Sequence, residues 1–170
     1  MIEIEVTPLV GIEINGSVIK LGASAADVKA VLGAPSSTGE NSLYYYENEL
    51  RFDMNKGSVE FIEFLGGING ELQPIVYGFS AFQTDADELY DVLKRKNNGE
   101  IDDSEAEYSY GFKEISVGVY REITPYDVQE MVADAHVGNE RLYDEDIDEE
   151  MNRASHWGTI GIGVANYYKR

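Results

Sequence analysis

The densest group of chemically capable side chains is an acidic stretch at residues 142–153, LYDEDIDEEMNR. A calcium loop of the EF-hand type needs oxygen ligands at positions 1, 3 and 5, glycine at position 6 and glutamate at position 12. Counted from Asp144, position 6 is Glu149 and position 12 is Ser155, so this stretch predicts no metal site. Glu140 precedes its six carboxylates, which are Asp144, Glu145, Asp146, Asp148, Glu149 and Glu150.

The same carboxylates are poor candidates for hydrolytic catalysis. A carboxylic acid works as a general acid near neutral pH when a partly apolar pocket raises its pKa. Crowded carboxylates in a polar stretch are expected to stay solvated, and Asp53, Glu60 and Glu63 on predicted strands have no specific partner. We therefore expect either a solvated helix face or an acidic surface that meets a cationic partner.

A second acidic stretch, DDSEAEYSYGF at residues 102–112, combines carboxylates with tyrosines. Tyr108 and Tyr110 have strand spacing, which places alternate side chains on one face. Carboxylates beside tyrosine rings suit Arg- and Lys-rich surfaces, through ion pairs and cation–π contacts. One alternative stays open, in which the tyrosines belong to the core and the carboxylates to an ordinary loop. The carboxylates are Asp102, Asp103, Glu105 and Glu107.

Other catalytic patterns are absent from the sequence. It contains no cysteine, which excludes disulfides, zinc–thiolate sites and thiol catalysis. Its two histidines, His136 and His156, lack a metal-binding spacing, and there is no G-x-S-x-G motif. The glycines of LGGING (65–70) and TIGIGVANYY (159–168) fit turns and strands better than phosphate loops. We therefore expect no enzyme activity, no cofactor and no bound metal.

The formal net charge of −19 bears directly on partners. It repels nucleic acid and anionic membranes and favours rapid, salt-dependent encounter with a cationic protein, although acidity also serves solubility alone. Residues 71–170 hold 22 acidic and 9 basic side chains, against 10 and 4 in residues 1–70. The start, MIEIEVTPLV, has no basic region followed by an apolar run. We expect a cytoplasmic protein with no signal peptide and no membrane helix.

The first part of the chain predicts a hairpin, a helix and antiparallel strands. Asn15-Gly16 between two short alternating runs is a strong hairpin signal. In GASAADVKAVLGAP (22–35), Ser24 and Asp27 predict a capped helix start, and Gly33 with Pro35 predicts its end. Residues 43–54 and 58–65 then alternate as strands do, with turns at 47–48 and 55–57.

The second part repeats this order. Thr84 with Asp87 predicts the start of a helix that ends near Gly99, and strands follow the second acidic stretch. Thr124-Pro125 begins a third helix, the 142–153 stretch continues as a helix through Ala154, and a final strand closes the chain. We predict one α+β domain over residues 1–170, with repeat-like halves at about 9–66 and 74–168. Its mostly antiparallel sheet has helices on one face, in two tandem helix-then-strands repeats with a helical insertion and a final strand.

Residues 20–65 resemble small bacterial folds related to the β-lactamase inhibitory protein and to outer-membrane-assembly lipoproteins. The shared pattern is G-x-s-x-x-[DE]-V-x-x-x-L-G-x-P, followed by a tyrosine-rich strand and a strand pair. It is matched by Gly22, Ser24, Asp27, Val28, Leu32, Gly33 and Pro35. The resemblance implies a tandem arrangement of such units and allows a structural or assembly interaction module as one function. The chain departs from these families in lacking their disulfides, signal peptide and lipobox.

In overall character the chain also resembles bacterial immunity proteins, which neutralise toxins of polymorphic or contact-dependent growth-inhibition systems. The shared features are strong acidity, the lack of cysteine and the lack of catalytic motifs. The resemblance implies a cognate toxin as partner, often a basic nuclease domain, and occlusion of the toxin's active site as mechanism. No family residues transfer, so the expected binding residues are those of the two acidic stretches. A DNA-mimicking inhibitor and an unrecognised enzyme remain as further alternatives.

Overall fold

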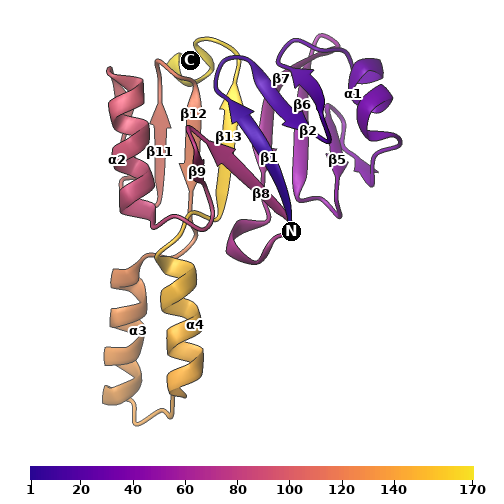
Figure 1. Ribbon diagram of the computed structural model, residues 1–170. Coiled ribbons are helices and arrows are strands. Elements are labelled where there is room, and N and C mark those ends of the chain that lie inside the picture. Colours follow the sequence, from indigo (N-terminus) through magenta and orange to yellow (C-terminus); the bar gives the residue numbers. More distant parts are fainter.

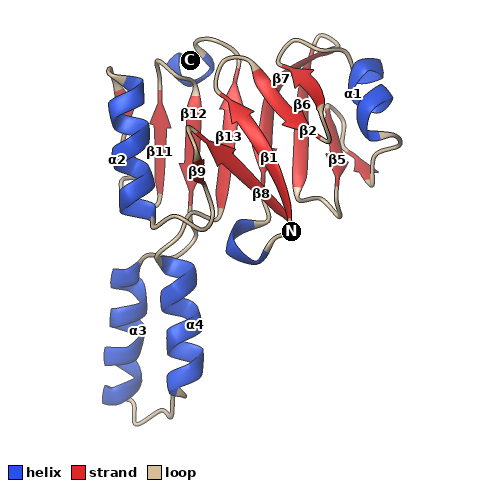
Figure 2. Cartoon of the chain, in the orientation of Figure 1, coloured by secondary structure: helices blue, strands red, loops and turns tan.

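The computed structural model describes residues 1–170, and its largest element is an eight-stranded antiparallel sheet (Figures 1 and 2). The strand order is β10-β11-β12-β13-β7-β6-β5-β4. The strands are β4 Ser37–Thr38, β5 Ser42–Tyr45, β6 Leu50–Asn55, β7 Ser58–Phe64, β10 Ile101–Asp102, β11 Ser109–Phe112, β12 Val117–Tyr120 and β13 Thr159–Gly163.

A second sheet of five strands, in the order β3-β2-β1-β8-β9, lies in front of the first (Figure 1). Asn15 and Gly16 both have positive φ between β2 and β3, which confirms the predicted Asn-Gly hairpin. β1 and β8 are far apart in sequence and pair in parallel. The strands are β1 Ile2–Thr7, β2 Gly11–Ile14, β3 Ser17–Lys20, β8 Leu72–Val76 and β9 Phe79–Ser80.

The four helices are α1 Ala25–Leu32, α2 Ala86–Asn97, α3 Pro125–Val137 and α4 Asp144–Ala154. The predicted capping residues of α1 and α3 are confirmed, since Ser24 with Asp27 and Thr124 with Asp127 each form a reciprocal capping box. The expected cap of α2 is wrong. Its N-cap is Asp85, whose carboxylate accepts from two backbone N–H groups of the first turn, so the helix begins one residue later than Thr84 would place it.

The core lies between the two sheets. The five-stranded sheet covers the middle of one face of the large sheet, and α2 and α1 flank it near opposite ends (Figure 1). Side chains that alternate along the strands, such as Phe52 on β6 and Ile62 on β7, belong to one buried cluster that also includes Ile4 of β1 and Leu89 of α2. Because inward and outward residues alternate along a strand, the opposite face of the large sheet remains available to other contacts.

The large sheet consists of two four-stranded meanders, each preceded by a helix. α1 precedes β4 to β7 and α2 precedes β10 to β13, and the two meanders meet where β7 pairs with β13. The α+β fold with two tandem helix-then-strands repeats, a helical insertion and a final strand is therefore confirmed. The insertion lies between β12 and β13, so the final strand is the fourth strand of the second meander.

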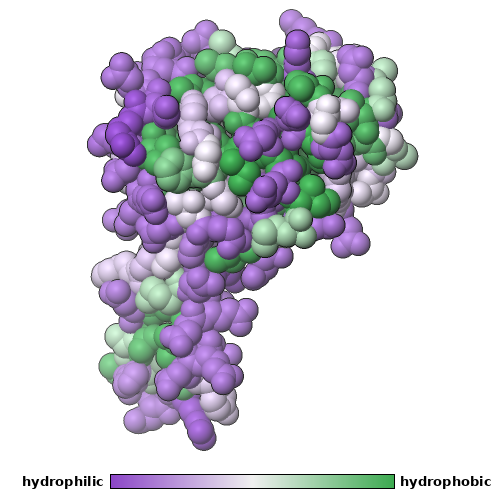
Figure 3. All heavy atoms as spheres, in the orientation of Figure 1, coloured by the Kyte–Doolittle hydropathy of each residue, from purple (hydrophilic) through white to green (hydrophobic).

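The insertion is a helical hairpin, Pro125–Ala154, that projects beyond the end of both sheets (Figure 1). α3 and α4 pack along each other and bury Val128, Ala135 and Ala154, whereas most other side chains of the hairpin face solvent. Hydrophilic side chains cover much of the hairpin in Figure 3, with an apolar strip along it. This thin internal interface means that its connection to the sheet decides how firmly the hairpin is held.

Candidate binding site at the base of the helical hairpin

A hollow of about 520 Å³ lies where α2, the end of the acidic loop (102–107) and the first turn of α3 meet. We call it the acidic hollow, because its lining contains four carboxylates and three tyrosines beside a single cationic residue. Asp85, Ala86, Asp87, Tyr90, Asp91, Glu107, Tyr110, Arg121, Thr124, Pro125, Tyr126 and Ser155 line it. Carboxylates and phenol rings together suit a guanidinium or ammonium group.

Of the three tyrosines of the acidic hollow, Tyr90 and Tyr110 are half-buried and Tyr126 is exposed. Tyr110 is half-buried, 4.6 Å from Tyr90 and 5.9 Å from Trp157 between ring centroids, and its hydroxyl accepts from the Glu107 N–H. Tyr126 is 61% exposed and hydrogen-bonds to Glu130. Tyr110 therefore packs partly in the core and supports the hollow from below, while Tyr126 forms part of its rim.

The one cationic residue in the lining, Arg121, is already satisfied within the molecule. Arg121 is only 7% exposed, and its Nε donates to the Glu107 carbonyl at 2.7 Å. Nη1 donates to the Ala154 carbonyl at 2.9 Å, and the guanidinium lies 5.0 Å from the Trp157 ring centroid. A cation that enters the hollow would therefore meet carboxylates whose charge Arg121 does not pair with directly.

Arg121 also brings the ends of the two acidic stretches together. Glu107 closes the acidic loop and Ala154 closes α4, and both carbonyls accept from the same guanidinium. α4 begins at the tip of the hairpin and ends at its base beside the sheet, so its carboxylates are distributed along the length of the hairpin (Figure 1). The structure thus joins the two stretches through their backbones at one end.

The remaining residues of the 102–112 acidic stretch are at the surface. Asp102, Asp103 and Glu105 are exposed, and a hydrogen bond from Ser104 lowers the pKa of Asp102. Tyr108 is exposed as well, and its hydroxyl donates to Asp127 in the first turn of α3, which raises the pKa of this tyrosine. The acidic loop is therefore fastened to the hairpin rather than free.

The carboxylates of α4 are nearly all exposed along the hairpin. Asp144, Glu145 and Asp146 occupy the first helical turn, where negative charge interacts favourably with the helix dipole. Glu150 is half-buried and lies 3.5 Å from Arg153. Asp148 and Glu149 are exposed, so this stretch forms a helix whose carboxylates face solvent and are accessible to a partner.

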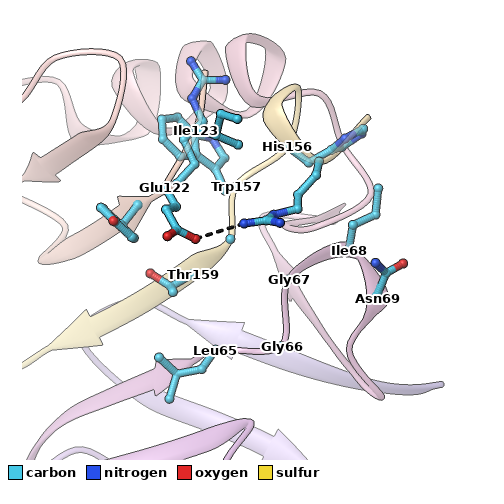
Figure 4. Close-up of a pocket in the computed structure, with 14 residues that line it drawn as sticks. Leu65, Gly66, Gly67, Ile68, Asn69, Glu122, Ile123, His156, Trp157 and Thr159 are labelled. Carbon is cyan, nitrogen blue, oxygen red and sulfur yellow. Dashed lines mark hydrogen bonds and ion pairs between the residues drawn. The ribbon is translucent and has the colours of Figure 1, made fainter. Parts of the chain in front are cut away.

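A second hollow of about 360 Å³ lies on the hairpin base beside residues 65–69 (Figure 4). Three charged residues line it, Arg121, Glu122 and Arg153. Arg121 is held by backbone carbonyls, and Arg153 Nη2 lies 2.9 Å from a Glu122 carboxylate oxygen. His156 also lines it, with Nδ1 2.6 Å from the Asn152 carbonyl, and the Nδ1 of His136 lies 2.8 Å from the Val132 carbonyl. No group of three or more His, Asp or Glu side chains is placed to hold a metal ion.

Sequence reasoning identified Glu107, Tyr108 and Tyr110 near the hollow but missed its α2 side. Asp87 and Asp91 are four residues apart and share one helix face, with Tyr90 beside them. That spacing was readable in the sequence. What the spacing does not reveal is that this face of α2 turns toward the acidic loop and the start of α3.

Comparisons with protein-family models, with curated proteins and with solved structures find no match to this chain. No helix has both the length and the apolar character needed to cross a lipid bilayer.

Proposed function

We propose that this chain is an immunity protein that binds a cognate bacterial toxin, of which a basic nuclease domain is the leading candidate, and blocks it. The observation that carries the proposal is the projecting hairpin, which holds ten acidic and two basic side chains and stands beside the acidic hollow. An extended acidic arm with a tyrosine-rimmed hollow at its base has the shape and charge to cover a cationic cleft.

The physical mechanism is competition for positive surface. A nuclease presents lysines and arginines to phosphate groups, and a protein with a net charge of −19 is drawn to the same groups at long range. Carboxylates of the hairpin and acidic loop would pair with cations around the toxin's active site. A lysine or arginine of the toxin would enter the acidic hollow, between the carboxylates and tyrosine rings.

The first experiment tests the two acidic stretches against a matched control. One variant combines Asp103→Lys, Glu105→Lys, Glu145→Lys and Asp148→Lys, all at exposed positions. The control combines Glu3→Lys, Glu5→Lys, Glu13→Lys and Glu40→Lys, which are also exposed but lie outside these stretches. Each reversal adds 2 charges, so four reversals take the net charge of either variant from −19 to −11.

The readouts are protection of cells that express the toxin domain encoded immediately upstream, and affinity by calorimetry after co-purification. We expect the first variant to lose at least about 100-fold in affinity, equivalent to about 2.7 kcal/mol, and to lose protection. The control should stay within a few-fold of the unaltered chain. Equal behaviour of the two variants would show that the acidic stretches are not the binding surface.

A second candidate is a structural or assembly interaction module. The observation in its favour is the pair of helix-plus-four-strand units within one sheet, the arrangement implied by the resemblance of residues 20–65. This candidate places function on the first unit, so the control variant with Glu40→Lys, or changes on the exposed side of α1, would impair it. It also predicts that no toxin is encoded nearby.

A further inference from the structure

Residues Tyr167–Arg170, which we call the strap, lie on the face of the large sheet opposite the core. Gly111, Gly118 and Gly161 are direct cross-strand neighbours on β11, β12 and β13. A Cβ at Gly118 would come within 1.9 Å of the Tyr168 hydroxyl, and one at Gly111 within 2.9 Å of its ring. The ring of Tyr168 therefore rests flush on bare backbone.

Aromatic and ionic contacts hold the rest of the strap. Tyr167 stacks on Phe61 of β7, with ring centroids 4.6 Å apart and planes within 12°. Lys169 pairs with Glu114 at 2.9 Å, and Arg170 pairs with Glu60. The strap thus spans from the second meander to β7 of the first, across the junction of the two repeats.

Backbone hydrogen bonds to the sheet end before the strap begins. Val164 donates its N–H to the backbone carbonyl of Glu60, and its own carbonyl accepts from the Ser116 hydroxyl. Beyond Val164, the N–H of Tyr167 donates to the Val164 carbonyl and the N–H of Lys169 donates to the Asn166 carbonyl. Both bonds are local and neither reaches a strand of the sheet. The strap is therefore attached by side chains, and its release breaks no ladder bond of the sheet.

The surface that the strap covers would be acidic without the strap. It presents Glu60, Glu63 and Glu114, and its cation, Arg51, already pairs with Glu63 at 2.7 Å and with Asp53 at 3.2 Å. Burial raises the pKa of both Tyr167 and Tyr168, with nearby carboxylates adding to the effect. In a molecule of net charge −19, this surface is covered by one of its few basic segments.

We infer that this surface is a docking groove for an aromatic–basic segment of a partner protein, and that the strap occupies it in the unbound molecule. The strap displays the required chemistry in place: two neighbouring aromatic rings, one stacked on Phe61 and one on the glycine backbone, followed by two cations that face carboxylates. The groove lies at the end of the molecule away from the hairpin, so it is separate from the acidic hollow (Figure 1).

The test uses the full chain and a synthetic capped peptide of residues 166–170, Asn-Tyr-Tyr-Lys-Arg. In the unaltered chain the tethered strap competes with the peptide for the groove at high effective concentration. The peptide binds only those molecules whose groove is open, so its apparent affinity is reduced in proportion to that fraction. A chain with Tyr167→Ala and Tyr168→Ala should bind the peptide at least about 10-fold more tightly. NMR shifts should move at Gly111, Gly118 and Gly161.

A peptide with glutamates in place of the lysine and arginine is the matched control and should not bind. A second strap-weakened chain, Lys169→Glu with Arg170→Glu, keeps both rings and is expected to show the same gain if the double-alanine chain is poorly folded. The inference is overturned if neither chain binds the peptide more tightly than the unaltered chain does. It is equally overturned if the glutamate peptide binds as well as the basic one.

Discussion

The hydroxyl of Tyr108 donates to both carboxylate oxygens of Asp127, at 2.8 and 2.9 Å. Asp127 also forms the capping box of α3 with Thr124. One carboxylate therefore caps the projecting hairpin and holds the acidic loop against it. Two parts of the candidate site that are remote in sequence share a single anchoring group.

Loss of the Tyr108 hydroxyl should loosen the acidic loop without unfolding the domain. In Tyr108→Phe we expect faster amide hydrogen exchange over residues 103–108, because the loop loses its contact with α3. Tyr44→Phe, a change in the other meander, is the matched control and should leave that exchange unchanged. Unaltered exchange in Tyr108→Phe would mean that the backbone bonds of the loop suffice to hold it.

Acid should weaken the helix starts first. Hydrogen bonds from Ser24 lower the pKa of Asp27, and hydrogen bonds from Thr124 lower that of Asp127. A carboxyl whose folded pKa is lowered stabilises the fold fully above its unfolded pKa of about 3.9, and this contribution disappears as pH falls through the folded value. We expect the urea concentration at the unfolding midpoint to decrease as the pH is lowered below about 4. In Asp127→Asn, which lacks one of these carboxyls, the decrease should be less steep.

Glu63 should act in the opposite direction. Burial raises its pKa, although Arg51 opposes the shift. A carboxyl with a raised folded pKa stabilises the fold at low pH and loses that contribution as pH rises through the folded value. The acid sensitivity of Glu63→Gln should therefore exceed that of the unaltered chain, and comparison of urea midpoints between pH 3 and pH 6 measures the difference.

Arg121 should be the most costly single residue at the hairpin base. Arg121→Met keeps the length of the side chain but leaves the carbonyls of Glu107 and Ala154 without their donor. Bonds to charged donors contribute about 1.5–3 kcal/mol each, so we expect the free energy of unfolding to fall by about 3 kcal/mol. Arg95→Met, on an exposed position of α2, should change it by less than about 0.5 kcal/mol. Denaturation followed by the fluorescence of Trp157, the single tryptophan, measures both.

Gly161 should tolerate no side chain. A Cβ there would lie 2.1 Å from the Phe61 ring, which cannot withdraw because Tyr167 stacks on it. Gly161→Ala is expected to cost about 1–3 kcal/mol in the free energy of unfolding. Gly39→Ala, where the nearest atom would lie at an ordinary 3.6 Å, should change it by less than about 0.5 kcal/mol. Equal stability of the two variants would show that the Phe61 ring moves freely.

Local signals in the sequence were sufficient for the starts of α1 and α3 and for the repeat order, whereas the start of α2 was placed one residue too early. Ser24 with Asp27 and Thr124 with Pro125 specify their helices through neighbouring residues, and Asn15-Gly16 specifies its turn. The five-stranded sheet was not predicted, because it depends on the parallel pairing of Ile2–Thr7 with Leu72–Val76, and no local pattern encodes that pairing.

The candidate site shows the same division. The carboxylates and tyrosines of residues 102–112 were visible as a group because they are contiguous. Tyr90 and Asp91 join them only through the packing of α2 beside β11, and the role of Arg121 depends on two carbonyls that lie 14 and 33 residues away along the chain. Composition indicated an acidic, tyrosine-containing surface, but tertiary contacts determine which of these side chains meet.

The place of the hairpin in the repeat separates the hairpin from the strand pairing that forms the fold. In the first meander a tight turn at Asn55–Ser58 connects the third and fourth strands, whereas in the second the whole of α3 and α4 occupies the corresponding connection. The sheet therefore closes in the same way whatever this connection contains. A single exchange of sequence at this connection would therefore replace the hairpin, and with it the surface that we propose for binding, while every strand pairing stays unchanged.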